Sequence, residues 1–465
     1  MLGLKTSIAQ KSDRFLTRHF SGETLDYRQI AALIFPLFID QTFIVCMNLF
    51  NTSMISSSGL DAVSAVSMVD SVNIFLMYIF VAVATGGTII VAQFKGRGTL
   101  SEVPRAISGS VTAVLILAAT ISVSVIISAP LILEWIFGNA EAAVFENAKI
   151  YLIGSACSYV FFAMMEAVSA ALRGLGETRS SLVLTLVMNG LYVVLNFILI
   201  NIFDLGIVGM VISLITARIV AAIVSVLFLV RKRNPFRLKL TKIFSLDLSI
   251  IRRALTLGIP FAAEQMFFNG GKILTQTFIV GMGTLALATN AITSSVVSLF
   301  MIPANTFALA IITIVGQCIG RKDLVQAKKM IRSFFVLTSL SFVFLGLIIL
   351  PFLPGIVSIF GPTDSILDNI YLIIFVNTFA QAILWAPSFL VPSALRAGGD
   401  ATFTSVVSML SMWLFRVVLG YLLGVVLDWG VPGVWFAMEA EWGVRGIIFM
   451  IRSQGNRWYS HKVID

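Results

Sequence analysis

Long apolar stretches separated by short polar gaps dominate the pattern along the chain. Twelve of them are long enough for a helix that crosses a bilayer, which needs about 20 apolar residues. They cover about residues 30–55, 63–93, 106–133, 149–172, 181–201, 207–230, 252–280, 285–318, 332–353, 366–395, 403–427 and 432–451. Because only helices and closed barrels satisfy backbone hydrogen bonds in lipid, and runs this long are helices, the pattern predicts an all-α polytopic membrane protein with twelve transmembrane helices.

The gaps between these stretches alternate in charge. Lys and Arg gather in gaps 95–105, 173–179, 231–253 and 321–332, at Arg396 and in both end segments, whereas the other gaps are acidic. Basic loops stay on the cytoplasmic side, so both termini are expected in the cytoplasm, with residues 1–28 and 453–465 as tails. No small-residue cleavage site follows the first tail, so we interpret the first stretch as a membrane helix and not as a signal peptide.

The two halves of the chain repeat each other. The segment PLFIDQ from Pro36 faces PFAAEQ from Pro260, 224 positions later. At the same offset VAQFKGR faces VGQCIGR and DLG faces DWG, and ALRGLGE faces ALRAGGD one position out of register. Each half holds six helices and therefore starts on the same side, which predicts two parallel repeats.

These repeats define the expected domains. They are an N-lobe over 29–230, a basic cytoplasmic linker over 231–250 and a C-lobe over 251–452. Two matching bundles are typical of carriers that alternate access around a central site. In the two ALR segments, glycines are expected to end a helix, and the following acid, Glu177 or Asp400, to cap the next one.

Composition changes the picture by exclusion. Hydrophobic residues make up 58% of the chain and charged residues 12%, about half of the usual ~25%. This excludes a soluble enzyme, a nucleic-acid-binding protein and a disordered chain, and the net charge of +9 fits basic loops. No phosphate-binding loop, HExxH or GxSxG motif occurs, and the only histidines, His19 and His461, lie in the tails. The chain is therefore not expected to be an enzyme, and an ion gradient would have to drive any pumping.

One acid is matched between the two halves at mid-depth. Asp40 and Glu264 each follow a proline, Pro36 or Pro260, by four residues, and Gln41 or Gln265 comes next. A charge at this depth costs roughly 2.5–3.5 kcal/mol and needs a reason. The prolines are expected to bend their helices and free carbonyl groups. Carboxylate, amide and carbonyl oxygens would suit Na⁺, and a dry carboxylate would equally hold a proton; the alternative is a structural hydrogen bond between helices.

Other polar residues within the stretches outline a substrate cavity. We assign to it Asn51, Asn196, Asn269, Lys272, Asn377 and Gln381, against the alternative that the amides only join helices. Lys272 lies two turns after Glu264, where it is either the counter-ion of that acid or a charge that repels a cationic substrate. Arg416, Glu439, Glu441 and Arg445 are interpreted as structural ion pairs.

Several motifs together resemble the multidrug and toxic compound extrusion (MATE) family. They are the turns ALRGLGETR and ALRAGGDAT, the segments AQFKGRG and GQCIGRKD, the helix openings FPLFIDQ and GIPFAAEQ, and the loops DLGIVG and DWGVPG. The similarity runs from about residue 28 to 455.

The resemblance implies a monomeric exporter in a bacterial plasma membrane, with two six-helix lobes around a central cavity. Such proteins exchange small cationic, amphiphilic compounds for Na⁺ or H⁺ and carry no other cofactor. Many relatives have an Asp in the outer half of helix 1, where this chain has Asn51, and some have one in helix 5, where it has Asn196. We therefore expect Asp40 and Glu264 to couple the ion. The alternatives are a flippase for a lipid-linked or acidic substrate, and a channel or receptor without coupled pumping.

Overall fold

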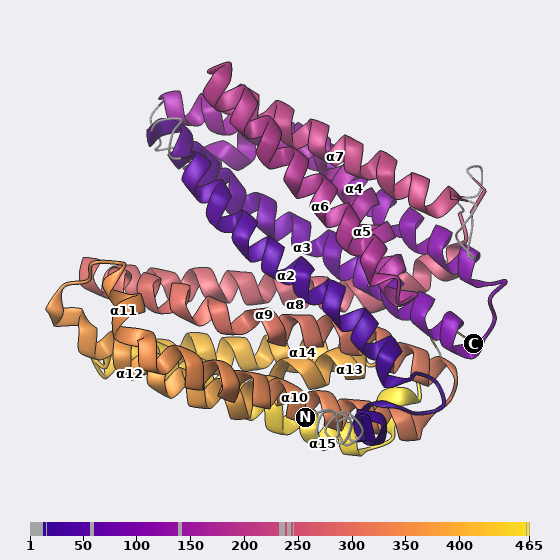
Figure 1. Cartoon of the computed structure of the whole chain (residues 1–465). Helices are drawn as coiled ribbons and strands as arrows, with labels where there is room; N and C mark the ends of the chain where they lie inside the picture. Colours follow the sequence, from indigo (N-terminus) through magenta and orange to yellow (C-terminus); the bar gives the residue numbers. More distant parts are fainter. Residues whose placement is uncertain are drawn as a thin grey trace, which may run out of the picture. The chain divides into compact units, whose positions relative to one another are not determined.

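The computed structural model is helical throughout, and no strand occurs among the residues that it describes. These residues are 13, 14, 16–55, 60–137, 142–231, 238, 239, 243, 244, 246–461, 463 and 464. The prediction of an all-α fold is confirmed (Figure 1).

The first six apolar stretches each lie on a long helix. These helices are α2 (Tyr27–Ile55), α3 (Leu60–Arg97), α4 (Val103–Phe137), α5 (Ala142–Gly174), α6 (Thr178–Asn196) with its π-helical end η2 (Phe197–Ile202), and α7 (Gly206–Val230).

The second six stretches repeat this series with more interruptions. They form α8 (Leu248–Gly281), α9 (Thr284–Gly320), α10 (Leu324–Ile349) with the short η4 (Leu350–Phe352) and α11 (Leu353–Ser358), α12 (Asp364–Ala380) continued by π-helix η5 (Gln381–Leu390) and α13 (Val391–Ala397), α14 (Ala401–Ser411) continued by π-helices η6 (Met412–Leu419) and η7 (Leu422–Val426), and α15 (Gly430–Gln454), followed by the short η8 (Arg457–Tyr459).

Ten helical segments of the described chain are long and apolar enough to cross a membrane. The two remaining long helices, α8 and α15, have 34 and 25 residues but carry several charged side chains, among them Glu264 and Lys272 in α8 and Glu441 and Arg445 in α15. The chain thus has the multi-pass architecture that the sequence predicts, while the orientation of its termini stays a prediction.

The turns between helices repeat in the two halves. Gly176 and Gly399, which follow the two ALR segments, have φ angles of 77° and 101°. Glycine adopts positive φ without the strain that a Cβ atom adds, so these positions confirm the predicted glycine turns. Glu177 and Asp400 occupy the N-cap positions of α6 and α14, as predicted, but neither side chain makes a capping hydrogen bond. Asp400 instead accepts a 2.7 Å hydrogen bond from Arg452 Nε.

The chain divides into two compact units whose boundaries lie inside two helices. We call residues 39–265 the N unit and residues 1–38 with 266–465 the C unit. One boundary falls in α2, two residues after Pro36, and the other in α8, five residues after Pro260. Compared with the predicted lobes 29–230 and 251–452, the first part of α2 belongs to the C unit and the first part of α8 belongs to the N unit. Much of the predicted linker, 232–237, 240–242 and 245, lies outside the described residues.

Close backbone approach holds the first part of α8 in the N unit. A Cβ atom on Gly258 would lie 2.5 Å from the Cα atom of Val83 in α3, and one on Gly86 would lie 2.7 Å from the carbonyl oxygen of Ala254. Small residues at helix crossings allow such contact, which drives helix association in membranes through packing. In the C unit, a buried apolar cluster joins α8, α9, α12 and α15; its members are Ile279, Val297, Ile373, Val431, Val434 and Trp435.

Candidate functional site

Asp40 lies buried in the N unit, with its side chain only 4% exposed. Its carboxylate makes side-chain hydrogen bonds with Thr185 of α6 and with Gln41. Oδ1 has no hydrogen-bond partner among the described residues. A buried carboxylate with an open acceptor is costly unless a proton or a cation satisfies it.

The charges close to Asp40 do not neutralise it. Its charged neighbours are Arg173 and Glu166 of α5. These two residues already pair with each other, because Arg173 Nη2 donates to Glu166 Oε1 at 2.6 Å. Two acids thus share one base, which leaves one negative charge in excess. This arrangement suits a removable cation better than a permanent salt bridge.

Glu264 is also buried, at 7% exposure, on the part of α8 that belongs to the N unit. Gln41 and Gln265 are half-buried. Among the described residues, no group of three or more His, Cys, Asp or Glu side chains could hold a metal ion. The joint role of Asp40 and Glu264 in ion coupling, including Na⁺ binding, stays a prediction, as does bending at Pro36 and Pro260.

A second acid of the N unit, Asp70 of α3, anchors a polar network that the sequence did not single out as a site. Its Oδ1 accepts hydrogen bonds from Tyr151 at 2.9 Å and from Asn73 at 3.4 Å. Asn73 in turn accepts from Tyr159 at 2.5 Å. Arg218 of α7 acts on Asp70 electrostatically and donates to Ser158 Oγ at 2.6 Å. The network ties α3, α5 and α7 together and keeps its charges balanced.

The amides assigned to a substrate cavity lie in different settings. Asn196 is 2% exposed and hydrogen-bonds with Tyr192, and its Oδ1 has no partner among the described residues. Asn377 donates to Glu439 Oε1 at 3.3 Å. Gln381 is fully buried, and neither polar atom of its side chain has a hydrogen-bond partner in the described chain. Asn269 is half-buried on α8. The side chain of Asn51 lies outside the described residues.

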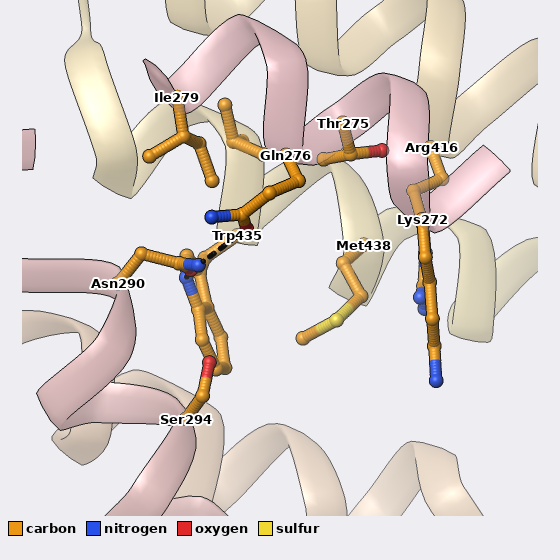
Figure 2. A pocket seen from close by; sticks show the side chains of 10 residues that line it. Lys272, Thr275, Gln276, Ile279, Asn290, Ser294, Arg416, Trp435 and Met438 are labelled. Carbon is orange, nitrogen blue, oxygen red and sulfur yellow. Dashed lines mark hydrogen bonds between the residues drawn. The ribbon is translucent and has the colours of Figure 1, made fainter. Parts of the chain in front are cut away.

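The C unit contains a cavity of about 300 Å³ between α8, α9, η6 and α15. Figure 2 shows Lys272 and Arg416 together at one side of it and Asn290, Trp435 and Ser294 at the other, with Met438 between. Among the described residues of the predicted substrate cavity, Lys272 is the one that lines it. None of the ten described lining residues is acidic.

An ion-paired cluster lies next to this cavity. Glu441 is fully buried on α15, and its two carboxylate oxygens lie 2.8 Å from Arg416 Nε and 3.0 Å from Arg445 Nη1. Arg445 also lies over the ring of Phe389, at 4.3 Å from its centroid. This confirms the predicted structural pairing for three of the four residues. Glu439 instead accepts its hydrogen bond from Asn377.

Comparison with known proteins agrees with this fold. The MatE family model matches the chain twice, over residues 36–198 and 260–422, so the matches start at Pro36 and Pro260 and keep the 224-residue offset. The "Uncharacterized transporter YisQ" of Bacillus subtilis is 27% identical over 437 residues, which cover 92% of this chain and 94% of YisQ. The "Probable multidrug resistance protein NorM" of Thermotoga maritima is 24% identical over 446 residues and 94% of each chain.

A solved structure, "Crystal structure of MATE in the bent conformation", has the same fold. Its TM-score is 0.84 at 17% sequence identity, over 92% of this chain and 94% of that chain. The two family matches together cover well over half of the sequence. The chain therefore belongs to the MatE family, whose members are multi-pass membrane transporters and not enzymes.

Proposed function

We propose that this chain is a secondary active exporter of small amphiphilic organic compounds, and that it exchanges them for Na⁺ or H⁺ by alternating access. Membership of the MatE family and similarity to a NorM protein named for multidrug resistance support the export of organic compounds. The bacterial relatives support a place in a bacterial plasma membrane.

Asp40 is the observation that carries the coupling step of this proposal. The Asp40 carboxylate is 4% exposed, and its Oδ1 has no hydrogen-bond partner among the described residues. Because it shares its basic neighbour, Arg173, with Glu166, a bound proton or cation would stabilise it most. Arg173 does not fill this role because Glu166 holds it at 2.6 Å. Loading the site with an ion removes the excess negative charge, and this change would favour one of the alternating states.

Transport in proteoliposomes tests the proposal. Na⁺ and pH gradients are imposed separately, and the transport of ethidium and of 8-anilinonaphthalene-1-sulfonate, a cation and an anion, is followed against their concentration gradients. We expect one ion gradient to drive one of the compounds, and Asp40→Asn to abolish this coupling. The matched control Asp364→Asn, at an exposed helix start, is expected to transport normally.

Two results would overturn the proposal. Equilibration of the compound without concentration would favour a channel, and gradient-driven transport that persists in Asp40→Asn would remove Asp40 from the coupling step. The charge of the preferred compound is a separate question. The resemblance to the family implies a cation, yet the lining of the C-unit cavity carries Lys272 and Arg416 and no acid.

A further inference from the structure

Two cationic groups meet at one side of the C-unit cavity. The Lys272 ammonium lies 4.9 Å from the ring centroid of Phe268, and the Arg416 guanidinium lies 5.0 Å from the same centroid. Both side chains line the cavity. Like charges held against one ring repel each other, and Lys272 experiences this repulsion from Arg416. An anion placed between the two groups would relieve it.

One buried acid, Glu441, lies near Lys272 and Arg416, but it does not neutralise both of their charges. Glu441 attracts Lys272, but its two carboxylate oxygens already face Arg416 and Arg445. Three basic groups therefore share one carboxylate. Arg416 Nη2 is buried and has no hydrogen-bond partner among the described residues. The cluster thus contains a buried donor without a hydrogen-bond partner among the described residues and an excess of positive charge.

The polar residues on the other side also present donors. Trp435 Nε1 donates to Asn290 Oδ1 at 3.0 Å, and Asn290 Nδ2 donates to Gln276 Oε1 at 3.0 Å (Figure 2). In this series of two hydrogen bonds, the side-chain amide oxygens of Asn290 and Gln276 act as acceptors. The side-chain N–H groups of Gln276 stand at the end of the series, and N–H groups suit a ligand that accepts hydrogen bonds.

The remaining wall of the cavity is apolar. Ile279, Val434 and Trp435 belong to the buried cluster of the C unit, and Met438 packs against that cluster. A flat aromatic or short aliphatic group would bury its surface here, while a charged group attached to it would reach Lys272. A volume of about 300 Å³ is at the small end of the range for ligand pockets.

From these contacts we infer that the C-unit cavity binds the acidic group of a small amphiphile, a carboxylate, sulfonate or phosphate, between Lys272 and Arg416, with its apolar part against Trp435 and Met438. This inference names the substrate class of the proposed exporter, and its role in transport rests on that function. The acidic compound is either a soluble aromatic acid or the headgroup of an anionic lipid, since the two share the chemistry that the cavity recognises.

Calorimetry on the purified full chain in a non-ionic detergent tests the site without any ion gradient. Three probes share one ring system and differ in charge: 2-naphthoate, 2-naphthamide and 2-naphthylmethylammonium. We expect 2-naphthoate to bind at least about tenfold more tightly than the other two, as the loss of a hydrogen bond to a charged group implies. Dihexanoylphosphatidylglycerol serves as the lipid probe, and the acid that binds more tightly identifies the source.

Variants locate the site. Lys272 has an exposed side chain, so Lys272→Gln is expected to fold and to weaken binding of the preferred acid about tenfold or more. Lys272→Glu is expected to reverse the order of 2-naphthoate and 2-naphthylmethylammonium. Arg416→Gln is expected to act like Lys272→Gln, and Lys149→Gln, a lysine of the N unit, is the matched control with unchanged binding.

The inference is overturned if neither acid binds, if the three naphthalenes bind equally, or if Lys272→Gln binds as Lys149→Gln does. These results leave the exporter proposal standing, because they involve no gradient. Conversely, binding of the acid in a chain that transports nothing under either ion gradient supports the cavity and rejects the exporter.

Discussion

Asp204 and Asp428, 224 positions apart, have the same left-handed backbone conformation, with φ angles of 52° and 55°. Each follows a π-helical segment, η2 or η7, and each is followed two residues later by a glycine with positive φ. The repeat is therefore present in the local backbone and not only in the order of the helices. Left-handed φ costs most residues roughly 1–2 kcal/mol, whereas Asp, Asn and Gly tolerate it.

Substitution of Asp428 tests this turn. We expect Asp428→Val to lower the free energy of unfolding by about 1–2 kcal/mol, because a β-branched side chain is strained at positive φ. The free energies of unfolding of Asp428→Asn and Asp428→Gly are expected to stay close to that of the parent. Thermal unfolding in detergent measures the differences, and the same three substitutions at Asp204 provide an internal replicate. Equal unfolding midpoints for the Val and Asn variants would contradict the role of φ.

The pattern along the sequence predicts the helices and their repeat, because span length and short motifs are local properties. It does not predict where the compact units divide. The boundaries fall inside α2 and α8, which remain continuous helices, so no change in hydropathy marks them.

The sites show the same limit of sequence reasoning. Asp40 is predictable as a site because an acid is rare in an apolar stretch. The Asp70 network is not predictable from the sequence, because Tyr151 and Tyr159 have the pattern of packing residues, and only the fold brings their hydroxyl groups to Asp70 and Asn73. The excess of positive charge near Lys272 also depends on tertiary packing, which brings α8, η6 and α15 together.

Removal of the shared acid is expected to damage the C unit strongly. In Glu441→Gln, Arg416 and Arg445 lose their common carboxylate while remaining buried. Removing one partner of a buried ion pair typically lowers the free energy of unfolding by about 3–5 kcal/mol, and we expect Glu441→Gln to lower it by an amount in this range. The measurement is the free energy of unfolding in detergent.

A double variant distinguishes lost charge balance from lost packing. Glu441→Gln combined with Arg445→Met removes one acid and one base, so it is expected to be more stable than Glu441→Gln alone. If the loss of unfolding free energy in the double variant equals the sum of the losses in Glu441→Gln and Arg445→Met, the two residues do not act as a pair.

Glu166 is expected to control the ion dependence of transport through Arg173. In Glu166→Gln, Arg173 loses its 2.6 Å carboxylate partner, so its positive charge acts on Asp40 without a competing acid. A neutralised Asp40 no longer needs a proton or Na⁺, so we expect gradient-driven transport to fall towards that of Asp40→Asn while the protein stays folded. Vesicle transport under each ion gradient measures this, with the exposed Glu146→Gln as control. Full coupling in Glu166→Gln would show that Arg173 does not reach Asp40.

Gln381 is expected to be dispensable for stability. Both polar atoms of its fully buried side chain have no hydrogen-bond partner among the described residues, so their desolvation is uncompensated. Gln381→Leu should raise the free energy of unfolding by about 1 kcal/mol or leave it unchanged. Asn377→Leu provides the contrast, because Asn377 donates to Glu439 and its loss should destabilise. A strongly destabilised Gln381→Leu would indicate that Gln381 has a partner, such as a buried water.

Asp247 joins α8 to α4 at the end of the linker. Its Oδ1 accepts from the backbone N–H groups of Ser249 and Ile250, at 3.1 and 3.3 Å, which caps α8. Its Oδ2 accepts a hydrogen bond from Arg105 Nε. This hydrogen bond lowers the pKa of Asp247 below its ordinary value of 3.8.

A lowered pKa makes the stability from Asp247 dependent on pH with a defined sign. The contribution is fully present above the unfolded-state pKa of about 3.9 and is lost as the pH falls through the lower folded-state value. Asp247→Asn keeps an oxygen that can cap the helix but removes the ion pair. We therefore expect the parent to melt above Asp247→Asn at pH 7, this difference to begin to shrink below about pH 4, and the difference to vanish only below the lowered folded-state pKa. Because Arg105 is 54% exposed, high salt should shrink the difference at pH 7 as well. A difference that grows on acidification would show that the ion pair does not stabilise the fold.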